Sequence, residues 1–83
     1  MTDDELIARW IEPNPDKAGL DEARIVGRGV EVWALVGYVE AYRGDLARVA
    51  RAFALPVAAV EAALAYYRVN KCAIDNRIAA NVA

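Results

Sequence analysis

The stretch that decides the fold is DLARVARAFALPVAAVEAAL, residues 45–64. Apolar residues recur at helical spacing over 46–53, Pro56 interrupts them, and the spacing resumes from Val57. Small residues at Ala50 and Ala54 allow two short helices to cross closely. The segment therefore predicts a helix-turn-helix, a motif whose second helix commonly enters the DNA major groove.

Length and composition describe one small domain that is rich in apolar residues. The chain has 83 residues, of which 58% are hydrophobic, and its net charge is −2. A monomer of this size has too little interior for so many apolar groups, so we expect a homo-oligomer, a dimer or larger. The near-neutral charge does not by itself indicate nucleic acid as a partner.

Acidic residues concentrate at the start of the chain. Residues 1–22 hold seven acids against Arg9 and Lys17, a net of −5, and the rest holds eight bases against five acids, a net of +3. Such an acidic segment either serves solubility or folds over a basic face of its own chain or of a neighbour.

The residue types argue against an enzyme and against a metal or cofactor site. The sequence has no histidine, and its one cysteine, Cys72, falls within a helical pattern where we expect a buried or half-buried packing role. Asp45 suits a helix cap, and Asp75 suits a surface pair, so no carboxylate pair has the setting of an acid–base catalyst. The lone cysteine, the absence of a membrane-length apolar run and the acidic start predict a cytoplasmic protein without a membrane partner.

Several local patterns place the other elements. Thr2 and Glu5 form a capping box for a short helix that ends at Glu12-Pro13, and residues 12–22 read as a linker. Two β-favouring runs flank Gly27-Arg28-Gly29 and predict a small hairpin.

A helical stripe follows the hairpin from about Val32, and Gly44 with Asp45 closes one helix and caps the next. Gly37 inside this helix suggests that another helix passes close to it. From Pro56 onward no residue breaks the pattern, which predicts one C-terminal helix about 40 Å long. The expected fold is mainly α, with an acidic helix and linker at 1–22 and a domain at 23–83.

Residues 23–75 resemble the domain of unknown function 433 family, a VapB-like antitoxin group. The order of a glycine-centred hairpin, a valine-rich helix, a glycine and the helix pair carries this resemblance, at Gly27, Val30, Val32, Leu35, Val36, Gly44, Val49, Ala50, Phe53, Leu55, Val60, Ala63, Leu64 and Tyr66. The resemblance implies a homeodomain-like helix-turn-helix and a PIN-type ribonuclease toxin as a partner. Arg28 and Glu31 depart from the family's hairpin, where a threonine and a proline are common.

The second helix of the motif lacks the side chains that read bases. Its expected exposed positions are Pro56, Val57, Ala58, Ala59, Glu61 and Ala62, none of them a good base reader. The arginines that could hold DNA by its phosphates are Arg24, Arg28, Arg43, Arg48 and Arg51, unless they form a solvated face paired with acids.

Apolar and aromatic residues of the last segment are candidates for a partner or dimer interface: Val57, Ala58, Ala62, Tyr66, Tyr67, Ile74 and Ile78. At helical spacing the aromatic residues are equally explained by core packing. The sequence thus favours an antitoxin-like dimer that binds a PIN-type toxin, with promoter DNA as a further target. The alternatives are an oligomeric protein-interaction module that does not read DNA, and a small repressor without a toxin.

Overall fold

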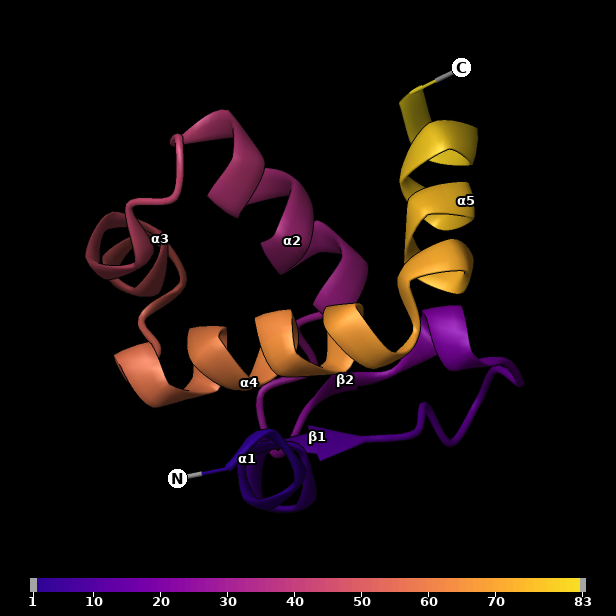
Figure 1. Ribbon diagram of the computed structural model, residues 1–83. Helices are drawn as coiled ribbons and strands as arrows, with labels where there is room; N and C mark the ends of the chain where they lie inside the picture. The colour runs from indigo at the N-terminus through magenta and orange to yellow at the C-terminus, as the bar shows by residue number, and fades with distance from the viewer. Residues whose placement is uncertain (1, 83) are drawn as a thin grey trace.

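Five α-helices and a pair of very short strands make up the part of the chain that the structure, a computed structural model, describes, residues 2–82 (Figure 1). The fold is therefore mainly α, as expected. The elements in chain order are α1 (Asp3–Trp10), β1 (Ile11–Glu12), the 3-10 turn η1 (Leu20–Glu22), β2 (Arg24–Ile25), α2 (Val32–Ala41), α3 (Leu46–Phe53), α4 (Val57–Val69) and α5 (Lys71–Val82).

The first helix begins with the predicted capping box. The Thr2 hydroxyl accepts the Glu5 N–H at 3.2 Å, and the Glu5 carboxylate accepts the Thr2 N–H at 3.2 Å. α1 lies across α4, where Leu6 is buried and Asp3 pairs with Arg68 at 2.9 Å. The acidic segment therefore folds over a basic residue of its own chain.

The strand pairing differs from the predicted hairpin. β2 pairs antiparallel with β1, with Ile11 opposite Ile25, whereas the run after the glycines forms a single bridge between Arg24 and Glu31. Gly27 and Gly29 both have positive φ, 71° and 69°, and this tight turn explains the two glycines. Because α2 begins at Val32, the second run contributes only this bridge to one edge of β2, and β1 pairs with the other edge.

The predicted helix pair is present as α3 and α4. Asp45 caps α3 by accepting the Arg48 N–H at 3.1 Å, and Ala54 ends it in the left-handed conformation with φ 55°. Pro56 then stands at the N-cap of α4, and the chain turns by 111° between the two helices. The steep crossing follows the spacing of small and apolar residues in 45–64.

α4 is the central helix of the fold. α1 covers it from one side, α2 and α3 cover it from another, and all three are visible around it in Figure 1. The main core is built from Ile25, Val32, Leu35, Val49, Val60 and Ile74, which have no exposed surface. Ala62, Ala65 and Leu6 are buried outside this main cluster, in the seam between α4 and α1.

The single long C-terminal helix predicted from the sequence is wrong. The chain breaks at Asn70, whose amide side chain and N–H both bond to the Tyr66 carbonyl, at 3.2 and 3.0 Å. α5 then starts at Lys71 and turns away from α4, so that Ile74 reaches the main core. Among the described residues, no single helix is both long enough and apolar enough to cross a membrane.

Arg77 holds α5 in this position. Its guanidinium pairs with Glu22 and lies 3.5 Å from Asp21 in η1 and 3.7 Å from Glu31 at the start of α2. It also stacks over the Trp33 ring at 5.0 Å. One side chain therefore links α5 to η1 and α2.

Candidate functional site

α4 is the helix that the sequence predicted to face a DNA groove, but most of its surface is covered. Ala59 and Ala62, expected to be exposed, have 0% exposed surface, so that expectation is wrong for both. They are buried because α2 and α3 pack on one side of α4 and α1 packs on the other. The exposed side chains of α4 before its last residue are Val57, Glu61 and Arg68.

This uncovered strip offers little to a DNA base. Val57 is apolar, and the Glu61 carboxylate repels phosphates. Arg68 donates two hydrogen bonds to the Asp3 carboxylate, at 2.9 and 3.1 Å. These bonds hold the pKa of Asp3 below its ordinary value. The strip therefore has one basic side chain, and that side chain is already paired.

The arginines proposed to hold phosphates fall into two groups. Arg24 pairs with Glu12 across the strand pair at 2.7 Å, so its guanidinium, unlike those of the other four, already has a carboxylate partner. Arg28, Arg43, Arg48 and Arg51 are exposed, and among the residues described here none of the four has a carboxylate within 4.0 Å.

Three of these arginines belong to α3 or touch its end. Arg48 and Arg51 lie one turn apart on α3, and Arg28 donates from its Nη1 to the Ala54 carbonyl at 3.0 Å, at the C-terminal end of the helix. Arg48 also stacks over the Tyr42 ring at 4.5 Å, which holds the guanidinium in place. We call Arg28, Arg48 and Arg51 the arginine surface.

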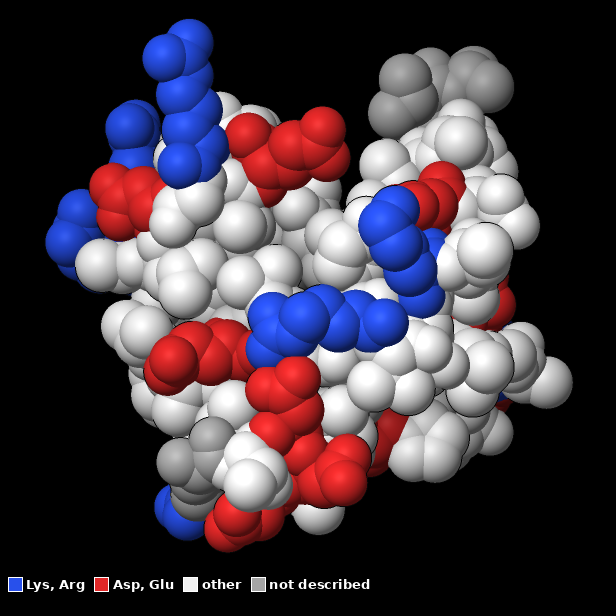
Figure 2. Space-filling model, in the orientation of Figure 1, with Lys and Arg blue, Asp and Glu red and all other residues white. Residues whose placement is uncertain are grey.

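Charge is separated on the molecule as Figure 2 shows it. Lys and Arg side chains lie over α3 and the turn before it, with a few acidic side chains beside them, and Asp and Glu side chains gather over α1. Arg43 lies in that turn, with a left-handed φ of 56°, between α2 and α3. Asp45 is the acidic residue nearest to Arg48 in the sequence. Its carboxylate caps α3 by accepting a hydrogen bond from the Arg48 backbone N–H.

Several residues expected at an interface belong to the interior. Ala62, Tyr66 and Ile74 are buried in the chain's own fold, so the interface assignment is wrong for these three. Tyr66 donates its hydroxyl to the Leu20 carbonyl at 2.6 Å, and burial raises the pKa of this phenol. Val57 is exposed, and the remaining candidates Ala58, Tyr67 and Ile78 are half-buried.

Two residues of α5, Cys72 and Asp75, had expected roles, in packing for the cysteine and in a surface pair for the aspartate. Cys72 is exposed, which corrects the packing role predicted for it, because the break at Asn70 rotates α5 out of the α4 stripe. Asp75 accepts from Tyr67 at 2.7 Å and from Lys71 at 2.7 Å, and these bonds hold the pKa of Asp75 below its ordinary value.

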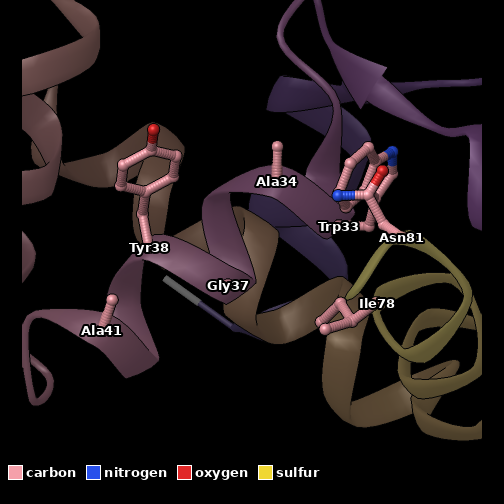
Figure 3. A pocket seen from close by; sticks show the side chains of 7 residues that line it. All are labelled: Trp33, Ala34, Gly37, Tyr38, Ala41, Ile78 and Asn81. Atoms are coloured by element: carbon pink, nitrogen blue, oxygen red, sulfur yellow. The ribbon is translucent and has the colours of Figure 1, made fainter. Parts of the chain in front are cut away.

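An open apolar cleft lies between α2 and α5, and sequence reasoning did not find it. Its volume is about 410 Å³, and Figure 3 shows its lining: Trp33, Ala34, Gly37, Tyr38 and Ala41 from α2, and Ile78 and Asn81 from α5. In Figure 2 the cleft is the notch between α2 and α5. The sequence does contain a signal for it, because α2 has one charged residue in ten, too few for a helix with a solvated face.

Gly37 lies in this cleft rather than against a crossing helix. A Cβ atom added there would meet none of the described residues within 4 Å, so no described helix of this chain passes close to it. Within residues 2–82, no three Cys, Asp or Glu side chains gather as a metal ion would require.

No family model, no curated protein and no solved structure matches the chain.

Proposed function

We propose that this protein binds nucleic acid through the sugar–phosphate backbone, using the arginine surface on α3, and does not read base sequence. The observation that carries the proposal is the set of exposed guanidinium groups at Arg28, Arg48 and Arg51, each without a carboxylate partner among the described residues. Guanidinium groups of this kind bind phosphate oxygens by paired N–H donors.

The position of these groups supports the proposal. Arg48 and Arg51 follow one another by a single turn, so both can reach the same strand of a duplex. The stacking of Arg48 on Tyr42 reduces the conformational freedom that binding would otherwise have to remove. A ligand at this surface also stays away from the acidic side chains over α1.

The enclosure of α4 argues for backbone contacts alone. A recognition helix needs a face of donors and acceptors that can enter the major groove. α4 instead presents Val57 and Glu61, and its alanines face α1, α2 and α3. We therefore expect affinity to depend on charge and salt, and not on the order of bases.

The experiment is a salt titration of duplex binding by fluorescence anisotropy, with two 16-base-pair duplexes of unrelated sequence. Three phosphate contacts give a slope of about −2.7 in log K against log salt, so affinity falls about 40-fold between 50 and 200 mM salt. Arg48→Gln and Arg51→Gln should each make that slope shallower by about 1. Both duplexes should bind within twofold of one another.

Arg9→Gln is the matched control, because Arg9 is an exposed arginine on α1, away from α3. It removes the same charge and should leave the slope unchanged. A slope that falls equally in all three variants would indicate a response to net charge alone. A tenfold preference for one duplex, abolished by changes at Val57 or Glu61, would contradict the proposal.

A second candidate is a protein-interaction module, and the cleft between α2 and α5 favours it. Uncharged side chains line this cleft, and Tyr38 in it is 45% exposed. Exposed apolar surface of this kind on a small domain commonly marks a binding face for another protein. The two functions use different surfaces of the molecule.

A further inference from the structure

The part of α2 that lines the cleft presents only uncharged side chains. Trp33, Ala34, Gly37, Tyr38 and Ala41 line the cleft from this helix, and its one charged residue, Glu40, does not line it. Tyr38 is held at one side by an edge-to-face contact with Phe53 of α3, with ring centres 5.0 Å apart. Trp33 is held at the other side by its hydrogen bond to Glu31, at 2.6 Å.

We propose that the occupant of this cleft is α2 of a second copy of the chain, packed antiparallel in a two-fold symmetric dimer. Small residues sit where the two backbones would meet, at Ala34, Gly37 and Ala41. Gly37 weakens the interior of its own helix, and none of the described residues comes within 4 Å of a Cβ placed there. A close helix crossing between two copies would use that space.

The face is complementary to itself in one register. A two-fold axis between positions 37 and 38 places Ala34 opposite Ala41 of the second copy. The same axis places the Tyr38 ring over the open Gly37 position of the second copy, a large side chain above the one residue with no side chain. An isologous interface requires this kind of reciprocal match.

Charge at the two ends of α2 favours the antiparallel arrangement. Arg77 lies at the start of the helix among three acids: Asp21, Glu22 and Glu31. Lys17 lies 4.0 Å from Glu22, so this group of three acids and two bases has a net charge of −1. Arg43, just past the other end, is exposed and has no carboxylate within 4.0 Å among residues 2–82. Antiparallel packing brings Arg43 of each copy toward the acidic start of α2 in the other.

The test is the mass in solution by sedimentation equilibrium. The chain has a mass of 9.0 kDa, so a dimer has twice that mass, 18 kDa. Gly37→Gln fills the interface with a good helix former whose Cβ meets none of the described residues within 4 Å, so this variant should remain folded and sediment at 9.0 kDa. Ala47→Gln, at an exposed position of α3, is the matched control and should remain a dimer. Arg43→Glu should weaken association roughly tenfold or more, because it places like charges together.

Cysteine cross-linking tests the register in a Cys72→Ser background. Ala34→Cys mixed with Ala41→Cys should give a disulfide-linked dimer under mild oxidation, and neither variant alone should do so. A wild-type mass of 9.0 kDa at 200 μM would overturn the proposal. A Gly37→Gln protein that still sediments as a dimer would also overturn it, because the dimer would then use another surface. These outcomes do not depend on nucleic acid, so they stand apart from the test of the arginine surface.

Discussion

Substitution of Ala62 by arginine tests whether α4 is an enclosed helix. Ala62 has 0% exposed surface and lies in the seam between α4 and α1. An arginine there would bring a positive charge into a buried position that has evolved around an uncharged side chain. A buried unpaired charge strongly lowers the stability of the folded state. The structure can relieve that cost by releasing α1 from α4, so the loss of α1 packing sets the size of the effect.

That packing comes from Leu6, which is 9% exposed, and from the half-buried Ile7 and Trp10. Burial of a leucine contributes about 2 kcal/mol, and two half-buried side chains contribute roughly 1 kcal/mol each. We therefore expect Ala62→Arg to lower the free energy of unfolding by about 3–5 kcal/mol, including strain that remains at the site. This is a large share of the roughly 5–15 kcal/mol of a typical domain.

The assay is urea unfolding followed by far-ultraviolet circular dichroism. Glu61→Arg is the control, because Glu61 is the exposed neighbour of Ala62 on the same helix, and it should change stability by less than about 0.5 kcal/mol. Amide exchange in residues 5–12 should rise in Ala62→Arg if α1 is released. Equal stability of the two variants would refute the reasoning, since it would mean that α4 is open on the α1 side.

Further predictions concern the core, the surface thiol and two ion pairs. Ile74→Ala removes a fully buried side chain and should cost about 2–5 kcal/mol in the same urea assay. Tyr66→Phe removes the bond to the Leu20 carbonyl and should cost about 1 kcal/mol, again by urea unfolding. Cys72 should react with a thiol reagent in the native protein as fast as in urea, because it is exposed. The pKa values of Asp3 and Asp75 are lowered by Arg68 and Lys71, so these pairs stabilise the fold above the ordinary pKa of 3.8 and lose that contribution as pH falls below it. Unfolding of Asp3→Asn and Asp75→Asn should accordingly show a smaller loss of stability between pH 5 and pH 2 than the parent chain shows.

Local patterns predicted the elements whose causes lie within a few residues. The capping box at Thr2, the cap at Asp45 and the crossing of α3 and α4 all follow from side chains close in sequence. The long C-terminal helix failed because Asn70 looked like a neutral surface residue, whereas its amide bonds back to the Tyr66 carbonyl and the next helix docks on the core through Ile74.

The functional surfaces were predictable only in part, for a similar reason. Exposure of Arg48 and Arg51 could be inferred from helical spacing, but the Glu12 partner of Arg24 depends on which strand β2 joins. The burial of Ala59 and Ala62 depends on other helices that pack against α4. The residue pattern of α4 alone does not show where those helices pack. The cleft beside Gly37 lies between α2 and α5, and α5 is linked to α2 and η1 through the ion pairs of Arg77 with acids far away in the sequence.

The most direct test of backbone binding through α3 is a titration of the nitrogen-15-labelled protein with a 16-base-pair duplex, followed by two-dimensional NMR. The account predicts that shifts concentrate in the amides of residues 45–54 and in the side-chain N–H groups of Arg28, Arg48 and Arg51, the same for two unrelated duplexes. Shifts centred on residues 57–64 of α4, or shifts that differ between the duplexes, would contradict it.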